Sequence, residues 1–386
     1  MDDVAIAGAG PAGALAATIL ARAGLKVRVF DRARFPRHKL CGDTLNPGAL
    51  AVLRRHADVT PLIELSDPIA GMLLTGPGGV RVRGEYGGHT SGRSITRREL
   101  DRWLLDRARD AGAVIEEQVA VRGVALRDGR VGGVVAAGNG GQPLTHDARM
   151  VIAADGRRST IAIGRALSSQ PLTPRRWAIG SYFTGVAGMT TLGEMHVRRG
   201  HYIGVAPVPG GLSNVCLVLP HTPPSRTGSG DAGAKSWSQP ADTLMSYLRA
   251  NPELWARFEH AERIGDPVVL GPMAVDATAA GEPGLLLAGD AAGFIDPMTG
   301  DGLRFALRGA ELAAAVVQDV LGGTLPIGRA HLELESRRRR DFHAKWRFNR
   351  MLRSLVSSPS HLTAASLTAR LLPSVFTRMI RYAGDC

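Results

Sequence analysis

The chain has 386 residues, of which 44% are hydrophobic and 21% charged, and its formal net charge is +12. A chain of this length builds more than one layer or domain, because single domains usually hold about 100–200 residues. Aromatic residues make up only 5% and no nucleic-acid-binding motif is present, so we expect no nucleic-acid partner. The three cysteines are widely separated, which argues against a disulfide framework or a zinc site.

The N-terminus lacks the features of a targeting segment. Met1, Asp2 and Asp3 lead directly into an apolar stretch, without a basic region before it. No apolar run is long enough to span a bilayer. We therefore expect a cytoplasmic protein.

The first elements alternate between strand and helix. Residues 4–7 and 26–30 read as buried strands, and residues 11–22 as an Ala/Leu-rich helix that Gly24 ends. This order places a parallel sheet at the N-terminus. A second helix is expected at 97–111. The strands that follow are expected at 114–126, 130–136 (with an Asp-Gly turn between these two) and 150–154.

After residue 165 the pattern changes to short strands separated by Gly/Pro turns. Such strands favour an antiparallel sheet, and we expect them at 177–186, 194–199, 202–208 and 213–219. A Pro/Ser/Gly-rich loop is expected at 221–240, followed by a helix at 241–260 and a buried strand at 285–288. A helix at 302–321 and a helical, basic tail from residue 330 complete the chain.

The strongest motif is a glycine-rich turn between the first strand and the first helix. Gly8 permits the tight turn, Gly10 lets the backbone approach a diphosphate, and Gly13 lets the helix pack on the sheet. The helix N-terminus offers unpaired N–H groups to phosphates. Asp31, at the end of the second strand, is placed to accept hydrogen bonds from ribose hydroxyls. Strand, turn, helix and acid together predict a dinucleotide site.

Three further stretches carry a family resemblance. Residues 35–43 read Phe-Pro-Arg-His-Lys-Leu-Cys-Gly-Asp, and residues 289–302 read Gly-Asp-Ala-Ala-Gly-Phe-Ile-Asp-Pro-Met-Thr-Gly-Asp-Gly. Arg97, Leu100 and Asp101 match an Arg-x-x-Leu-Asp helix start, and Asp155-Gly156 follows a buried strand. Together with the first turn, these motifs resemble the class A flavin monooxygenase superfamily and, within it, the geranylgeranyl-reductase-like branch.

The resemblance implies FAD as cofactor and an α/β fold. The Rossmann-like FAD-binding domain, built on a parallel sheet, would consist of residues 1–70, 96–165 and 276–325. An antiparallel-sheet substrate domain would consist of 71–95 and 166–275, and 326–386 would form a basic helical C-terminal region. No second Gly-rich unit for NAD(P)H is present, so a transiently docked NAD(P)H or a separate reductase would supply the electrons.

The resemblance also implies which residues bind FAD and which lie at the reacting ring. Cys41, Gly42, Pro297, Gly300 and Gly302 would line the isoalloxazine ring. The cofactor-binding set is Gly8, Gly10, Ala12, Gly13, Asp31, Arg32, Arg37, Cys41, Gly42, Arg97, Val119, Asp155, Gly156, Gly289, Asp290, Pro297, Gly300 and Gly302. The candidate catalytic residues are Cys41, Tyr202 and His38, with His201 as a further hydrogen-bonding group.

Each of these roles has a simpler alternative. Cys41 is also compatible with an ordinary buried apolar position, Arg37 with a surface charge, and Tyr202 with packing inside the sheet. Asp155-Gly156 taken alone is a common turn.

The reaction type stays open between two chemistries. Related halogenases carry Trp-x-Trp-x-Ile-Pro where residues 202–207 read Tyr-Ile-Gly-Val-Ala-Pro, so halogenation is disfavoured. The reductase branch shows Tyr-x-Trp-x-Phe-Pro there, and Gly204 and Ala206 would open space over the ring. We favour an NAD(P)H-driven monooxygenase that hydroxylates a small lipophilic or aromatic substrate through a flavin C4a-hydroperoxide. The alternative is a C=C reductase or dehydrogenase of a polyprenyl or lipid-like substrate. An electron-transfer or structural flavoprotein is an alternative of another class.

The C-terminal region is basic and amphipathic. Residues 329–353 hold nine Arg/Lys and three Asp/Glu, interleaved with Phe342, Trp346 and Leu352 at helical spacing. A second such stretch includes Leu371, Leu372 and residues 375–380. The first interpretation is that the apolar stripe packs on the catalytic domain and the arginines face water. The second is a peripheral helix on an anionic membrane, at its inner face.

Overall fold

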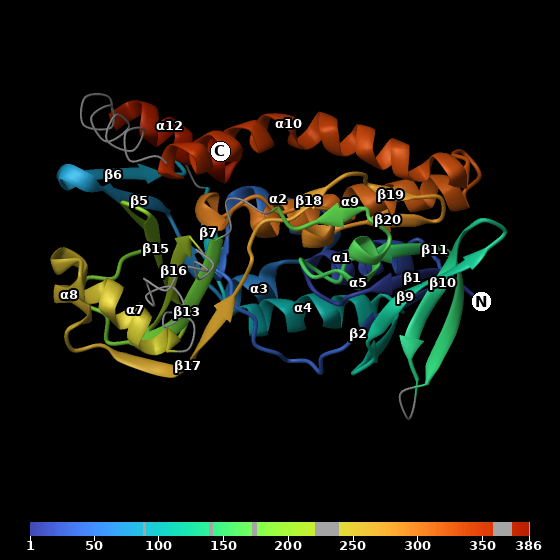
Figure 1. The fold of residues 1–386 in the computed structure, drawn as a ribbon, viewed down its shortest axis with the longest axis horizontal. Coiled ribbons are helices and arrows are strands. Elements are labelled where there is room, and N and C mark those ends of the chain that lie inside the picture. The colour runs from blue at the N-terminus through green and yellow to red at the C-terminus, as the bar shows by residue number, and fades with distance from the viewer. Residues whose placement is uncertain (88–89, 139–141, 172–175, 221–238, 358–372, 386) are drawn as a thin grey trace, which may run out of the picture.

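The computed structural model describes residues 1–87, 90–138, 142–171, 176–220, 239–357 and 373–385. Figure 1 shows two sheets side by side, with the parallel sheet and its helices on the right and a second sheet on the left. The long helix α10 (Ala330–Ser357) runs along one side of the molecule. The chain is therefore an α/β protein with two sheet layers and a helical C-terminal region.

The first sheet is parallel at its centre. Its parallel strands, in spatial order, are β8 (Val114–Glu117), β2 (Val27–Asp31), β1 (Asp2–Ala7), β11 (Pro143–Ala153) and β20 (Leu285–Leu287). The short edge strand β19 (Gly281–Glu282) is antiparallel to β20, and β9 (Val121–Arg127) and β10 (Arg130–Ala137) form a hairpin that extends from β11. Residues 4–7 of β1 are buried, as expected for a parallel strand that is covered on both faces.

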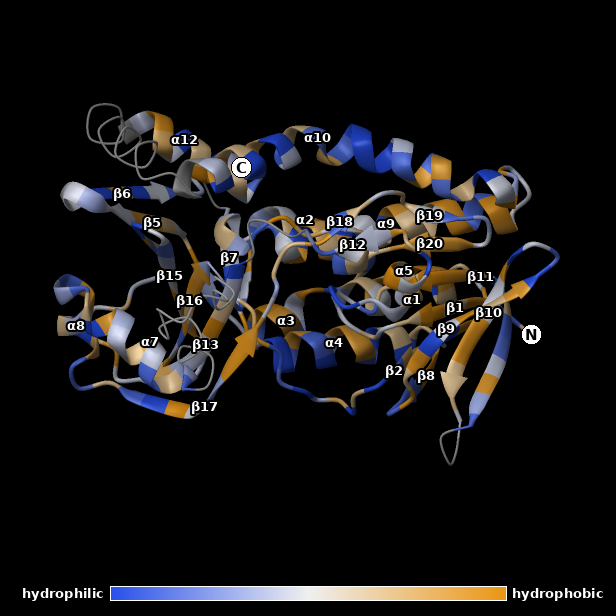
Figure 2. Cartoon of the chain, viewed as in Figure 1, coloured by the Kyte–Doolittle hydropathy of each residue, from blue (hydrophilic) through white to orange (hydrophobic). Residues whose placement is uncertain are grey.

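Helices cover one face of this sheet, and the β9–β10 hairpin together with the short helix α5 (Thr160–Gly164) covers the other. On the first face α1 (Pro11–Arg22) packs against α9 (Gly302–Leu321) and α4 (Arg97–Asp110). The other helices of this part are α2 (Pro47–His56) and α3 (Thr60–Glu64). Figure 2 shows apolar residues concentrated in the central strands and in α1. This burial of the sheet stabilises the strand ends, where the glycine-rich turns lie.

The second sheet is mostly antiparallel. Its strands, in spatial order, are β17 (Glu262–Leu270), β13 (Arg176–Thr184), β16 (Leu212–Pro220), β15 (His201–Val208), β14 (Leu192–Arg198), β5 (Gly71–Gly76) and β6 (Val80–Glu85). Only the β14–β5 pair is parallel among these strands. One face packs on α7 (Pro240–Arg249) and α8 (Pro252–Phe258), where Phe183 meets Phe258. The opposite face carries Ala178, Met195 and Tyr202 and turns toward the first sheet.

Short elements connect the two sheets. Strands β3 (Thr44–Leu45), β7 (Gly92–Ser94) and β4 (Asp67–Ile69) form a small sheet, and β12 (Ser168–Ser169) pairs with β18 (Asp276–Ala277). The 3-10 helices of the described residues are η1 (Pro77–Gly79), η3 (Gly289–Ala292), η4 (Pro297–Thr299) and η5 (Ile327–Arg329).

Two elements expected from the sequence are divided. The expected strand 114–126 is two strands, because Gln118 has a φ of 62° and the chain leaves the parallel sheet there to enter the hairpin. The expected helix 241–260 is α7 and α8, since Pro252 has no N–H to continue the helix. Most of the expected loop at 221–240 lies outside the described residues.

The C-terminal helices lie against the rest of the chain. Phe342 of α10 is buried and its ring packs edge-on against Phe305 of α9, at 5.1 Å between ring centres. In α12 (Pro373–Gly384), Ile380 is buried beside β6, and Phe376 packs near it. Leu371 and Leu372 lie outside the described residues. The apolar stripe thus packs on the protein, as the first interpretation expects, and no helix of the described residues meets the length and hydropathy needed to cross a membrane.

Candidate active site

The turns after three neighbouring parallel strands converge at one edge of the first sheet. Strand β11 lies between β1 and β20, and Ala154 N–H donates to Ala7 O at 2.7 Å while Ala288 N–H donates to Ala153 O at 2.9 Å. Gly8 has a φ of 95°, and a Cβ atom there would lie 2.4 Å from Ala154 O. Glycine is therefore required where the first two turns meet.

The first turn is shaped to receive a diphosphate. A Cβ atom on Gly13 would lie 1.8 Å from Gly8 O, so α1 packs directly on the turn. Gly10 is the N-cap of α1 and no side chain caps this helix end, which leaves its first N–H groups for a ligand. The Asp31 carboxylate accepts from Ala9 N–H and Ala33 N–H, both at 2.8 Å. Asp31 thus fixes the turn and retains acceptor capacity for ribose hydroxyls.

Positively charged side chains lie close to these turns. The Arg37 guanidinium lies 3.7 Å from the position of a Cβ atom on Gly10 and pairs with Asp101 at 3.1 Å. Lys39 Nζ lies 4.0 Å from the corresponding position on Gly156, and burial, together with the charge of Arg97, lowers the pKa of Lys39 to about 8. Arg157 lies 3.7 Å from Asp290. The backbone space and the positive charge fit the diphosphate of FAD.

A cavity of about 180 Å³ lies between this sheet edge and the second sheet. Its flavin side is formed by residues from the turns and from the start of α9, namely Gly10, Ala12, Gly156, Gly289, Asp290, Pro297, Gly300 and Gly302. Its opposite wall is mostly apolar and consists of Leu40, Ala178, Met195, Val218, Leu270 and Met273, with Cys41, Tyr202 and Cys216 beside them. A flat ring held at the turns would therefore face an apolar wall.

The Cys41–Gly42 segment is anchored by a buried carboxyl group. Asp43 accepts from Tyr182 Oη at 2.6 Å, from Asn214 Nδ2 at 2.5 Å and from Arg97 N–H at 3.1 Å. Asn214 also donates to Cys41 O at 2.8 Å. Burial raises the pKa of Asp43 to about 6, and the hydrogen bonds from Tyr182 and Asn214 work against this rise. This network fixes the loop beside the cavity.

Tyr202 has the same kind of anchoring role on the opposite loop. Its hydroxyl group donates to Asp296 Oδ1 at 2.6 Å, and Asp296 pairs with Arg176 at 2.8 Å. Burial and the Asp296 charge raise the pKa of Tyr202 well above its ordinary value. The ring lines the cavity, but the hydroxyl proton is committed to Asp296.

Arg97 is a third buried anchor. Its guanidinium makes a bidentate ion pair with Asp101 at 2.7 and 2.8 Å, and its side chain also lines the cavity. Burial lowers the pKa of Arg97, but the charge of Asp101 and the interaction with the Cys41 side chain outweigh it, so the pKa is raised. Arg97 is therefore positioned to stabilise negative charge on Cys41.

Comparison with known proteins agrees with this site. Residues 1–182 match the FAD binding domain family. Over 329 residues the chain is 32% identical to digeranylgeranylglycerophospholipid reductase 1 of Methanopyrus kandleri, covering 83% of this chain and 81% of that protein. It is 30% identical over 336 residues to menaquinone reductase of Mycolicibacterium smegmatis, covering 82% and 76%. The chain belongs to the geranylgeranyl-reductase-like family of FAD-dependent oxidoreductases.

Solved structures show the same fold. A geranylgeranyl bacteriochlorophyll reductase-like protein from Thermoplasma acidophilum superposes with a TM-score of 0.75 at 22% identity, covering 98% of each chain. The myxobacterial chondrochloren halogenase gives 0.79 at 22% identity, covering 90% of this chain and 81% of that one. At this identity the likeness concerns the fold alone.

Several residues proposed for this flavoenzyme lie away from the cavity. His38 and Arg32 are exposed and do not line it, and His201 packs against the Tyr247 ring with Nδ1 near Arg199 O. The Asp155 carboxylate accepts from Thr160 N–H at the start of α5. Val119 N–H donates to Asp31 O, which holds the chain beside the Asp31 turn. Asp155 and Val119 therefore shape the edge of the sheet.

Sequence reasoning missed part of the flavoenzyme cavity. Lys39 and Arg157 lie inside the sequence motifs, but the sequence did not predict a cofactor-binding role for them. Both line the cavity. The apolar wall was missed because Met195, Val218 and Leu270 come from three different strands. The alternation of apolar and polar residues along each strand predicts which side chains face the interior. It does not predict which of these side chains come together at one cavity.

Proposed function

We propose that this FAD-dependent oxidoreductase reduces carbon–carbon double bonds in a prenyl or similar lipid-like substrate, with NAD(P)H as the source of electrons. The observation that carries the proposal is the apolar wall opposite the flavin turns. Its aliphatic and thioether side chains suit a hydrocarbon chain and offer few groups to hold a polar one. Two relatives are named as reductases of digeranylgeranylglycerophospholipid and of menaquinone, and the geranylgeranyl groups in the first name support a prenyl substrate.

FAD held beside Gly10, Gly156 and Asp290 would, once reduced, supply hydride chemistry at one carbon of the double bond. The wall formed by Leu40, Met195 and Met273 holds the substrate and excludes water. Cys41 is the proposed proton donor for the second carbon, because its side chain lines the cavity and Arg97 can stabilise the thiolate that remains. Cys41 would thus give its proton to one new C–H bond, the hydride of the other coming from reduced FAD, and solvent would return a proton to Cys41 after the product leaves.

A second candidate is hydroxylation, as first favoured from the sequence. Gly204 lines the cavity, and nothing lies closer than 3.9 Å to the position of a Cβ atom there. The room that an aromatic residue would otherwise fill is therefore available for a planar ring. In this reaction, O₂ would provide the oxygen atom and NAD(P)H the electrons.

The two candidates differ in their need for oxygen. Purified protein is mixed with NAD(P)H and either a prenyl lipid or a phenol, under air and under argon, and products are identified by mass spectrometry. We expect a prenyl product that gains two hydrogens under both atmospheres. A product that gains one oxygen atom, only under air, would overturn the reductase proposal in favour of hydroxylation.

Cys41→Ser tests the proton donor. We expect turnover to fall by about 10²-fold or more, since a positioned general acid contributes at least this much. FAD content and KM should change little, because the loop is held by Asp43 and Asn214. Unchanged turnover with full FAD content would remove Cys41 from the reaction.

A further inference from the structure

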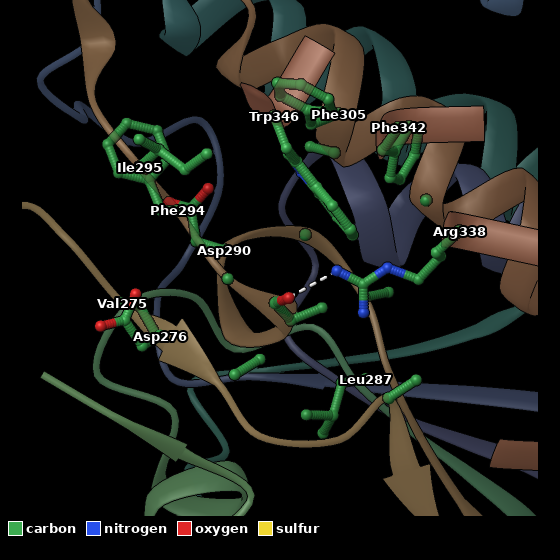
Figure 3. A pocket seen from close by; sticks show the side chains of 18 of the residues that line it. Val275, Asp276, Leu287, Asp290, Phe294, Ile295, Phe305, Arg338, Phe342 and Trp346 are labelled. Atoms are coloured by element: carbon green, nitrogen blue, oxygen red, sulfur yellow. Dashed lines mark hydrogen bonds between the residues drawn. The ribbon is translucent and has the colours of Figure 1, made fainter. Parts of the chain in front are cut away.

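A second cavity lies beneath helix α10. It has a volume of about 370 Å³ and is enclosed by α10, α9 and the segments 275–280 and 289–296 (Figure 3). It shares Gly289, Asp290, Phe294, Gly302 and Ala306 with the lining of the flavin cavity. The loop that carries the flavin residues is therefore the partition between the two cavities.

One wall of the second cavity is aromatic. The Phe305 and Phe342 rings meet edge-on with centres 5.1 Å apart, and the Phe342 and Trp346 rings are 5.6 Å apart. Figure 3 shows these three side chains gathered on one side of the cavity, with Arg338 below them. Such a wall suits an apolar chain or a flat ring.

Arg338 brings a buried positive charge to this wall. The residue is 8% exposed, its Nη2 donates to Ala292 O, and its guanidinium lies 5.7 Å from the centre of the Trp346 ring. Within the described ranges it forms no ion pair. Burial lowers the pKa of Arg338 to about 10, which still leaves it charged at neutral pH. A buried cation without a carboxylate partner is unfavourable unless an anion joins it.

Four of the five carboxylates that line the same cavity pair with other cations. Glu335 pairs with Arg339 at 2.8 Å, Asp296 with Arg176 at 2.8 Å and Asp301 with Lys345 at 3.4 Å. Asp290 lies 3.7 Å from Arg157, and Asp276 is exposed. The charge of Glu335 also acts on Arg338, but no carboxylate of the described residues pairs with Arg338 directly, so its guanidinium can bind an anionic ligand.

Two other buried atoms in the lining, Asp301 Oδ2 and Asn349 Oδ1, have no hydrogen-bond partner among the described residues. Asn349 is 4% exposed. An acceptor of this kind is satisfied by a hydroxyl or amino group of a ligand.

We propose that this cavity binds an organic phosphate with an apolar or aromatic body, its anionic group on Arg338 and its body on the Phe305–Phe342–Trp346 wall. The proposal does not depend on which bond the flavin site reduces. A prenyl phosphate and a nucleotide both have this chemistry. Because the cavity shares a loop with the flavin site, a bound phosphate compound would contact the segment that holds the flavin.

The test is calorimetric titration of the FAD-loaded protein with five probes: geranyl phosphate, geraniol, AMP, adenosine and inorganic phosphate. We expect one of the two organic phosphates to bind at one site per chain. The matching compound without the phosphate, or the phosphate alone, should bind about tenfold more weakly or worse, as expected for the loss of a charge-assisted hydrogen bond or of the apolar contact. Whether geranyl phosphate or AMP binds identifies the lipid or the nucleotide as the source.

Two variants localise the binding. Arg338→Met removes the cation, and we expect about tenfold weaker binding. Arg340→Met is the matched control, since its side chain is 67% exposed on the same helix. Gly309→Leu fills the cavity while Arg338 stays, because nothing lies within 4 Å of a Cβ atom at Gly309. Leucine also favours the helix over glycine, so stability should not fall.

Three outcomes would overturn the proposal. These are the absence of binding by either organic phosphate, equal binding of geraniol and geranyl phosphate with no binding of AMP, and unchanged affinity in Gly309→Leu. In the last case the phosphate compound binds elsewhere, for example in the flavin cavity. Retained FAD in each variant separates these results from a failure of the flavin site itself.

Discussion

Two loops flank the flavin cavity, and each is held by a tyrosine of the second sheet. Tyr182 of β13 binds Asp43 at the end of the loop 35–43, and Tyr202 of β15 binds Asp296 in the loop 293–302, both at 2.6 Å. Both carboxyl groups are buried. The second sheet thus fixes both segments against which the flavin ring must lie.

The two anchors differ in charge. Asp296 faces the Arg176 guanidinium at 2.8 Å, whereas Asp43 is bonded by a phenol, an amide and the N–H of Arg97, whose own guanidinium pairs with Asp101. Asp43 therefore changes protonation near pH 6. One loop is thus held by an ion pair and the other by a proton-sensitive network, and only the network should respond to mild acid.

The largest effect is expected at the charged anchor. Arg176→Met leaves Asp296 buried without its cation, which should lower the free energy of unfolding by about 3–5 kcal/mol. Urea unfolding measures this change. Arg127→Met, at an exposed pair with Asp147, is the control and should change stability by about 1 kcal/mol or less. Equal losses in both variants would contradict the charged anchor.

A slightly smaller effect separates the two anchors by pH. The pKa of Asp43 is about 6 in the folded protein and its ordinary value is 3.8, so its contribution to stability is fully present below pH 3.8 and is lost as the pH rises through 6. Between pH 4 and pH 7, the unfolding free energy of Asp43→Asn should therefore rise by about 2 kcal/mol relative to that of the wild type. Urea unfolding across this range tests it. A difference that does not change with pH would show that Asp43 keeps its ordinary pKa.

The tyrosines give a third contrast. Tyr182→Phe should destabilise by about 1 kcal/mol at pH 5 and about 2 kcal/mol at pH 8, because a hydrogen bond to an ionised group is the stronger one. Tyr202→Phe should lose about 2 kcal/mol at both pH values, since Asp296 stays beside Arg176. Thermal unfolding at the two pH values measures both. If both variants behave alike, the two anchors do not differ in protonation.

The smallest effect concerns Lys39 in the first loop. Its pKa of about 8 predicts that FAD affinity falls as the pH rises through 8, because only the protonated amine attracts the diphosphate. Lys39→Met should bind FAD about tenfold more weakly at pH 7 and lose this pH dependence. Flavin fluorescence titration of apoprotein at pH 7 and pH 9 would show it. An identical pH profile in the variant would exclude Lys39.

The strand–turn–helix start and the three convergent turns were predictable because their signals are local. Gly8, Gly10 and Gly13 stand where close backbone contacts require glycine, and short apolar runs mark the buried strands. The element boundaries at Gln118 and Pro252 were less predictable. The first depends on a positive φ where the chain leaves the parallel sheet, and the second on the single missing N–H of proline. Cys41 and Gly42 do line the cavity, but the role of Tyr202 could not be predicted.

By itself the sequence determined the family, the cofactor and the edge of the sheet at which the cofactor binds. These signals are local, because the glycine spacing and the strand order depend on residues that are close together in the sequence. Only the tertiary structure decided that Tyr202 serves as an anchor, since its partner Asp296 lies 94 residues away. It also decided that the basic tail covers a cavity containing the buried Arg338. Such pairings depend on how whole elements pack, and no local pattern records them.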